Sequence, residues 1–80
     1  MEHKERFETA FASDDPVEAL RSLAIKFSSE GYGRRQIYKI FLDFYKYLQA
    51  ENREMDEYTL GDVMDMIMGE YAPFNLHLPD

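Results

Sequence analysis

The fold of this chain is decided by residues 34–50, which read RRQIYKIFLDFYKYLQA. Apolar side chains recur there at the i, i+3, i+4, i+7 and i+11 spacing of one helix face, at Ile37, Ile40, Phe41, Phe44 and Leu48. The stretch contains no Gly or Pro that would interrupt a helix. It therefore predicts an amphipathic α-helix whose apolar side must be covered by other helices.

A second helix is predicted over about residues 16–30, just before this stretch. Asp15 can accept a hydrogen bond from a first-turn amide, Pro16 suits the first helical position, and Glu18 lies three residues after the cap. Gly31 is the residue type that most easily adopts the left-handed conformation at a helix end. These signals predict a short connection, residues 31–33, between two neighbouring helices.

A third helix is predicted over about residues 57–69. It follows a polar linker, residues 51–55, and begins at Asp56 or Thr59. Its apolar side chains are Leu60, Val63, Met64, Ile67 and Tyr71. Gly69 marks its end, and Pro73 forbids its continuation.

The two ends of the chain differ from this helical region. Residues 1–13 are a polar segment in which Phe7 and Phe11 are four apart, a spacing that favours a short helix. Residues 73–80 alternate Phe74, Leu76 and Leu78 with polar side chains, which is typical of an extended arm. We therefore expect an all-α protein: a small three-helix bundle over residues 14–72, with a short extra N-terminal helix as an option and an extended C-terminal arm.

Length and composition exclude several classes of protein. Eighty residues are enough for one small domain, and the absence of Cys excludes disulfide scaffolds and cysteine-based zinc sites. The longest unbroken hydrophobic run is three residues, which predicts no membrane span. The charged N-terminus lacks the apolar region of a signal peptide, so we expect a cytoplasmic protein.

The net charge of −7 is unevenly distributed. A basic patch is expected in residues 34–50, at Arg34, Arg35, Lys39 and Lys46. An acidic patch is expected in residues 51–70, chiefly at Glu54, Asp56, Glu57, Asp62 and Asp65. Overall acidity disfavours binding to a phosphate backbone, so nucleic acid ranks low among the expected partners.

No set of residues in the sequence indicates catalysis. The two histidines, His3 and His77, lie near the ends of the chain, where a catalytic base is rarely held in place. Asp62 and Asp65 share a helix face but lack a His partner, and residues 51–57 do not have EF-hand spacing. We expect no enzymatic activity, no cofactor and no metal site.

The aromatic content is high for so small a domain, with six Phe and six Tyr. Some of these rings are expected at an interface, so we predict a homodimer and a protein partner. The candidate contacts lie on one flank of the helix at 34–50 and in the tail, at Tyr38, Leu42, Tyr45, Phe74, Leu76 and Leu78. Met64 belongs to the apolar stripe of the last helix, and Met66 and Met68 lie off its centre. Core filling is the favoured interpretation of these methionines, and adaptable surface for a partner is the alternative.

The leading functional hypothesis is a non-enzymatic protein-interaction module, an adaptor or regulator that binds through this aromatic and Met-rich helix surface. One alternative is an acidic inhibitor or antidote protein that mimics nucleic acid with its acidic patch and blocks a basic enzyme site. A second alternative is weak nucleic-acid binding through the basic patch, because basic and aromatic side chains together can hold a single strand.

Overall fold

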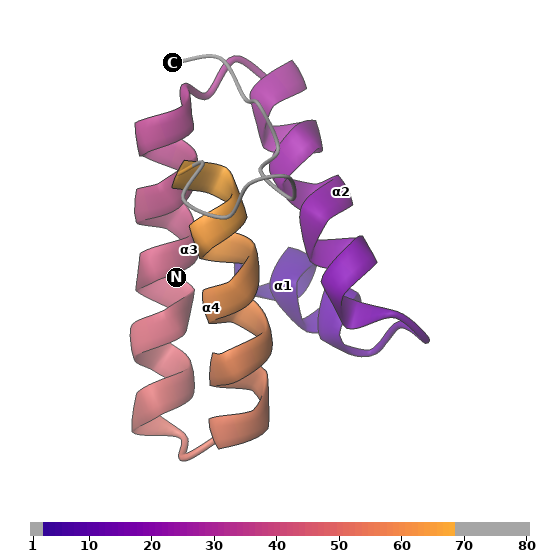
Figure 1. Cartoon of the computed structure of the whole chain (residues 1–80), viewed down its shortest axis with the longest axis vertical. Coiled ribbons are helices and arrows are strands. Elements are labelled where there is room, and N and C mark those ends of the chain that lie inside the picture. The colour runs from indigo at the N-terminus through magenta and orange to yellow at the C-terminus, as the bar shows by residue number, and fades with distance from the viewer. Residues whose placement is uncertain (1–2, 69–80) are drawn as a thin grey trace.

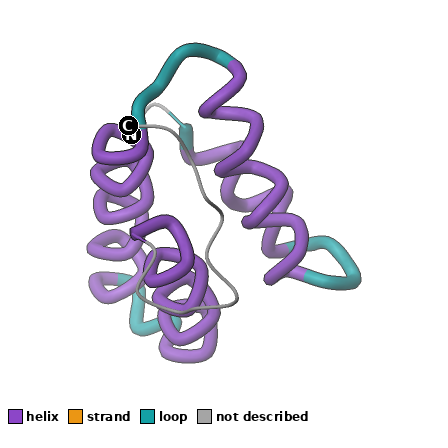
Figure 2. The backbone as a smooth tube through the Cα atoms, turned by 45° about the horizontal axis from the view of Figure 1, so that its top comes forward, coloured by secondary structure: helices purple, strands orange, loops and turns teal. Residues whose placement is uncertain are grey.

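A computed structural model describes residues 3–68, which form four α-helices and no β-strand. They are α1 (Lys4–Phe11), α2 (Pro16–Ser29), α3 (Arg34–Ala50) and α4 (Glu54–Met68). Short connections join successive helices, and α3 and α4 lie side by side in opposite directions (Figures 1 and 2). The all-α prediction is confirmed, including the extra N-terminal helix. The predicted extended arm, residues 73–80, lies outside the described residues.

The N-terminal helix α1 is an integral part of the core. Phe7 is fully buried, and its ring stacks on that of Phe44 with centroids 4.6 Å apart. The ring of Phe41 meets Phe7 edge-on at 4.9 Å. The N-terminal segment, residues 1–13, is predicted from the sequence to be mainly polar. It instead supplies a core residue, because Phe7 packs against Phe41 and Phe44 of α3.

Both ends of α2 have the predicted signals. The carboxylate of Asp15 accepts a hydrogen bond from the Glu18 amide at 3.2 Å, and Pro16 occupies the first turn. At the other end Gly31 has φ +102°, and the amide of Tyr32 donates to the carbonyl of Phe27 at 3.2 Å. The Tyr32 ring then packs edge-on against Phe27, which completes a Schellman motif with its hydrophobic contact.

The connection from α3 to α4 uses the same motif with a different residue. Asn52 has φ +58°, and the amide of Arg53 donates to the carbonyl of Leu48 at 3.0 Å. Helix α4 then begins at Glu54, three residues earlier than predicted. Thr59 is not a cap, because its hydroxyl donates to the Met55 carbonyl inside the helix. The polar linker is thus only residues 51–53.

The core lies where the four helices meet. Among the described residues every buried side chain is apolar. The core consists of Phe7, Ala10, Leu20, Leu23, Ala24, Phe27, Ile37, Phe41, Phe44, Leu48, Leu60, Val63, Met64 and Ile67. Four phenylalanines are fully buried, whereas Tyr32, Tyr38, Tyr45 and Tyr47 border the core and Tyr58 is exposed. The outer side of α3 and α4 carries three of these rings, Tyr38, Tyr45 and Tyr58.

Within residues 3–68, none of the helices combines the length and the apolar character needed to cross a membrane.

Candidate functional site: the groove between α3 and α4

A groove of about 400 Å³ runs between α3 and α4 on the outer side of the molecule. Helix α3 contributes Tyr38, Leu42 and Tyr45, which follow the i, i+4, i+7 spacing of one helix side. Helix α4 contributes Glu57, Tyr58, Gly61, Asp62, Met64 and Asp65. The three side chains predicted on α3 as interface contacts therefore lie together in one concave surface.

Aromatic and apolar side chains form the walls of this groove. Tyr38, Leu42 and Tyr45 are half-buried, because each packs against the core on one side. Tyr58 is 73% exposed, and Met64 is only 5% exposed, so Tyr58 stands on the rim and Met64 belongs to the base. Tyrosine provides a large, rigid contact area with a polar tip, which is why it is enriched at interfaces.

Gly61 keeps the groove open. It lies in the interior of α4, where a glycine costs roughly 1 kcal/mol relative to alanine. A Cβ atom at this position would lie 3.9 Å from Cε2 of Tyr45, an ordinary van der Waals distance. Backbone strain and crowding therefore do not require glycine here. A larger side chain would instead extend into the groove.

Carboxylates surround the α4 side of the groove. Glu57, Asp62 and Asp65 line it, and Glu54 is exposed one turn before Glu57. These four acids form no ion pair with another described residue. No Lys or Arg is among the described residues that line the groove. The site is therefore apolar at its centre and negative along one rim.

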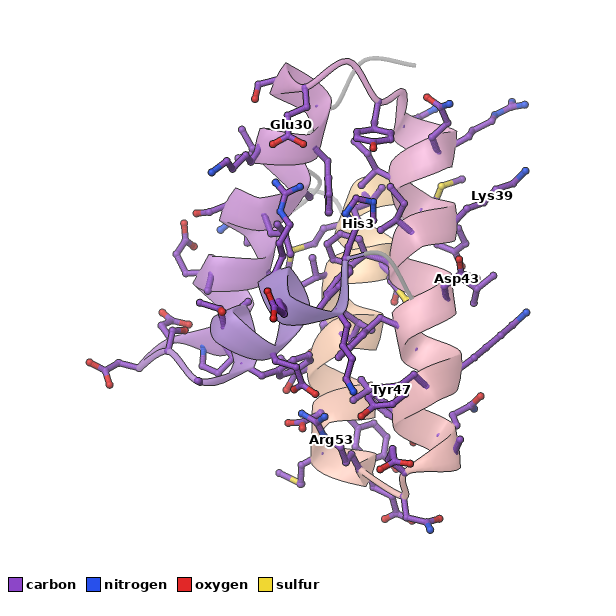
Figure 3. The ribbon with its side chains drawn as sticks, turned by 180° about the vertical axis from the view of Figure 1, so that it is seen from behind. His3, Glu30, Lys39, Asp43, Tyr47 and Arg53 are labelled. Carbon is purple, nitrogen blue, oxygen red and sulfur yellow. The ribbon has the colours of Figure 1, made fainter. Side chains whose placement is uncertain are left out.

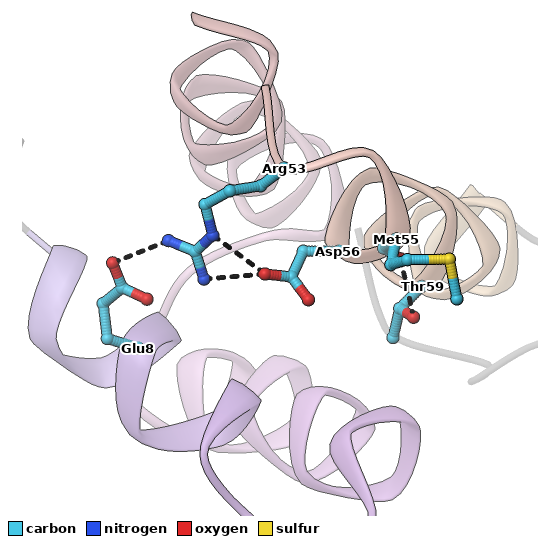
Figure 4. Close-up of polar contacts among 5 residues, drawn as sticks. All are labelled: Glu8, Arg53, Met55, Asp56 and Thr59. Atoms are coloured by element: carbon cyan, nitrogen blue, oxygen red, sulfur yellow. Dashed lines mark hydrogen bonds and ion pairs between the residues drawn. The ribbon is translucent and has the colours of Figure 1, made fainter. Parts of the chain in front are cut away.

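Asp56 does not belong to this acidic rim, which corrects the predicted acidic patch. Its carboxylate accepts from Nε of Arg53 at 2.8 Å, and Nη1 of the same guanidinium donates to Glu8 of α1 at 2.9 Å (Figure 4). The two carboxylates raise the pKa of Arg53, the Glu8 hydrogen bond contributing most. Asp56 therefore has a structural role, in fastening α1 to the beginning of α4.

Sequence reasoning missed this cluster. The spacing of Arg53 and Asp56 is a local signal, because a base at the start of a helix can meet an acid three residues later. The third member, Glu8, is 45 residues away from Arg53, and no local pattern connects the two.

The predicted basic patch lies along α3, beside the groove. Arg35, Lys39 and Lys46 are exposed and form no ion pair with a described residue. Lys39 points away from the body of the molecule, as does Asp43 one turn later (Figure 3). Arg34 is half-buried, unlike the other three. The exposed basic strip is thus Arg35, Lys39 and Lys46.

Of the remaining candidates, His3 is the one that the structure describes, and it does not line the groove. His3 precedes α1, and its ring packs edge-on against Phe27 at 4.9 Å. Within residues 3–68, no three His, Cys, Asp or Glu side chains are grouped closely enough to hold a metal ion. His77 and the three tail contacts, Phe74, Leu76 and Leu78, lie outside the described residues.

Comparison of the chain with protein-family models, with curated proteins and with solved structures finds no match.

Proposed function

We propose that this protein is a non-enzymatic interaction module, an adaptor or regulator, that binds a protein partner in the groove between α3 and α4. The observation that carries the proposal is the convergence of Tyr38, Tyr45 and Tyr58 on one groove that also has an apolar base. Tyrosines around an apolar centre are typical of the residues that dominate binding energy at interfaces.

The charge of the rim supports a partner segment that is basic. Glu57, Asp62 and Asp65 have no described ion-pair partner, so they favour Lys or Arg in the bound segment. Tyrosine rings stabilise a guanidinium or ammonium group placed over their faces. Leu42 and Met64 favour an aliphatic side chain between these charges. The partner segment therefore combines basic residues with a Leu, Ile or Met anchor.

Selection of short random peptides on the immobilised protein tests this proposal. We expect the recovered peptides to be enriched in Arg or Lys near an aliphatic residue. The variant Gly61→Leu should lose them, because its side chain occupies the groove. Its thermal stability should be unchanged or higher, because leucine is a better helix former than glycine.

Ser22→Leu is the matched control, since Ser22 is exposed on α2 and does not line the groove. It adds the same side chain elsewhere and should select the same peptides as the natural sequence. Recovery of identical peptides on Gly61→Leu, or no enrichment of basic residues on the natural sequence, would contradict the proposed site.

The acidic inhibitor is a second candidate, favoured by the position of the unpaired carboxylates. Glu54, Glu57 and Asp65 follow the i, i+3, i+11 spacing of one side of α4, and Asp62 lies next to them. A row of charges of this kind resembles a phosphate backbone in its repetition. This candidate predicts binding to a basic protein that collapses with added salt. Because the carboxylates at the rim carry this binding and the apolar base of the groove does not, Gly61→Leu should weaken it less than it weakens binding of the peptides.

A further inference from the structure

The outer face formed by α3 and α4 is divided by charge into two edges. The basic strip of Arg35, Lys39 and Lys46 runs along α3, and the acidic rim of Glu57, Asp62 and Asp65 runs along α4. The tyrosines and Leu42 lie between them. Neither edge is paired within the described residues. A face with this arrangement can satisfy both edges by meeting a copy of itself.

We propose that a second copy of this chain covers the α3–α4 face. The twofold axis lies between the two faces and runs parallel to the helices. The inference rests on the proposed role of this face in binding, and it goes further by naming self-association as the state that occupies the groove in the absence of a partner. A twofold interface uses the same patch on both copies, so each contact occurs twice.

This rotation brings bases onto acids. It exchanges the two sides of the face, so α3 of one copy covers α4 of the other, and it keeps the level of each residue along the axis. Helices α3 and α4 are antiparallel neighbours joined by residues 51–53, so the end of α3 is level with the start of α4 (Figure 1). Bases near the end of α3 therefore meet acids near the start of α4.

The helical rise defines two ion pairs. Lys39 lies eleven residues before Ala50, and Asp65 lies eleven residues after Glu54, so each is about 16 Å from the connection at 1.5 Å per residue. Lys46 and Glu57 lie about 6 and 4.5 Å from it. Lys39 therefore meets the partner copy's carboxylate at position 65, and Lys46 meets the one at position 57. Arg35 lies farther from the connection than Met68 does, so the residue of the second copy that would face it is outside the described residues.

Apolar contact accompanies these pairs. Leu42 lies between Lys39 and Lys46 along α3, so it meets α4 of the other copy between the two acids. Tyr58 and Gly61 occupy that part of α4, beside the groove. The leucine can thus enter the groove of the second copy where glycine leaves space.

The charge of the whole molecule opposes association, because each copy carries −7. At physiological ionic strength the screening length is about 8 Å, so this long-range repulsion is largely removed. Adjacent charges of opposite sign at the interface are screened less. Asp43, which is exposed between Lys39 and Lys46 in the chain, reduces the basic strip by one charge and leaves it positive.

Charge reversal with rescue tests the arrangement. Sedimentation equilibrium of the full chain, from micromolar to millimolar concentration, should show a reversible dimer. Lys39→Glu and Asp65→Lys should each raise the dissociation constant about tenfold or more, because two symmetry-related pairs become repulsive. An equimolar mixture of the two variants should dimerise again, since the mixed pair restores both attractions.

Lys26→Glu and Asp14→Lys are the matched controls, because they make the same charge changes at exposed positions on and before α2. They correct for the altered net charge and should leave the dimer nearly unchanged. Far-UV circular dichroism should show equal helix content in all four variants. A mixture of Lys39→Glu and Asp65→Lys that stays monomeric would overturn the proposed interface, as would a natural sequence that is monomeric throughout.

The two proposals fail in different ways. A monomer that still selects basic peptides would overturn the dimer and keep the groove as a site for another protein. A dimer that selects no peptide at any concentration would overturn the proposed partner and leave self-association in place. If both hold, the peptide should shift the sedimentation profile towards the monomer, because the peptide and the second copy compete for one face.

Discussion

At the scale of single residues, Gly31 and Gly61 differ in whether the backbone needs a glycine. The backbone at position 31 does, and the helical backbone at position 61 does not. Gly31 ends α2 with φ +102°, a conformation that a residue with a Cβ adopts only at a cost. Gly61 has helical geometry in the interior of α4, where glycine weakens the helix and its Cβ position faces Tyr45. One glycine serves the backbone, and the other leaves space in the groove.

The same substitution should therefore change stability in opposite directions at these positions. We expect Gly31→Ala to lower the free energy of unfolding by about 1 kcal/mol, because nothing crowds the new Cβ and only the backbone is strained. Gly61→Ala should raise it by roughly 0.5–1 kcal/mol. Urea denaturation measures both. Equal effects of the two variants would mean that the conformation of Gly31 does not require glycine.

Gly33 differs from both, because its backbone conformation is open to any residue. The pattern Gly-Tyr-Gly suggests that both glycines free the backbone at this connection. Gly33 instead has φ −76° and ψ 165°, and its amide donates to the side chain of Gln36 at 2.8 Å. Its place at the start of α3 is that of a capping residue.

At the scale of helices, two arginines attach α1 to the rest of the molecule. Arg53 connects it to α4 through Glu8, and Arg6 forms a two-bond ion pair with Glu30 at the end of α2, at 2.8 and 3.1 Å. The guanidinium of Arg6 also lies 4.3 Å from the centre of the Phe27 ring. An eight-residue helix is too short to be stable alone, so these contacts and Phe7 are what hold it in place.

The Arg6–Glu30 pair should make stability depend on pH. The hydrogen bond from Arg6 lowers the pKa of Glu30 below its ordinary value of 4.5, so the folded chain binds this proton less readily than the unfolded chain. The stabilisation is therefore present above about pH 4.5 and is lost as the pH falls through the lowered folded value.

Comparison of the natural sequence with Glu30→Gln measures this contribution. We expect the variant to be less stable at neutral pH and the difference to shrink as the pH falls below 4.5 and Glu30 becomes protonated in the folded chain. Thermal unfolding of both proteins across this range provides the measurement. A difference that is constant with pH would show that the ionised carboxylate does not carry the effect.

At the scale of the whole molecule, α1 completes the hydrophobic core. A domain of this size has only several kcal/mol of net stability, so the loss of one large buried side chain is serious. Phe7 is that side chain, because its ring contacts Phe27, Phe41 and Phe44 from the other side of the interior.

Phe7→Ala should therefore lower the free energy of unfolding by roughly 3–5 kcal/mol. The melting temperature of the variant should fall well below that of the natural sequence. Phe11→Ala is the control, because Phe11 is half-buried and stacks on Phe44 only at 5.9 Å. Phe11→Ala should lower the free energy of unfolding by clearly less than Phe7→Ala. Circular dichroism during thermal unfolding distinguishes the two. Equal stability of Phe7→Ala and the natural sequence would show that α1 is dispensable to the core.

The candidate site was predictable on α3 and only partly on α4. The helical spacing of Tyr38, Leu42 and Tyr45 predicts that they share one flank beside the core, and all three line the groove. The same spacing says nothing about Tyr58, which completes the groove from α4. That contact depends on the rotation of α4 about its own axis, which the docking of its core residues decides. Of the methionines in α4, Met64 is a core residue that also forms the base of the groove, and Met66 and Met68 do not line it.

The amino-acid sequence by itself determined where the helices lie, because helical periodicity, caps and chain-reversing residues act over a few neighbouring positions. It misplaced the start of α4, where Asn52 took the left-handed conformation usually given to glycine. Only the tertiary structure decided which charges are paired and what the groove contains. Arg53 pairs with Glu8, which is 45 positions away, and α3 and α4 line one groove. Packing of the apolar faces brings these distant side chains together. Local sequence patterns cannot predict such contacts, because they depend on how the helices pack.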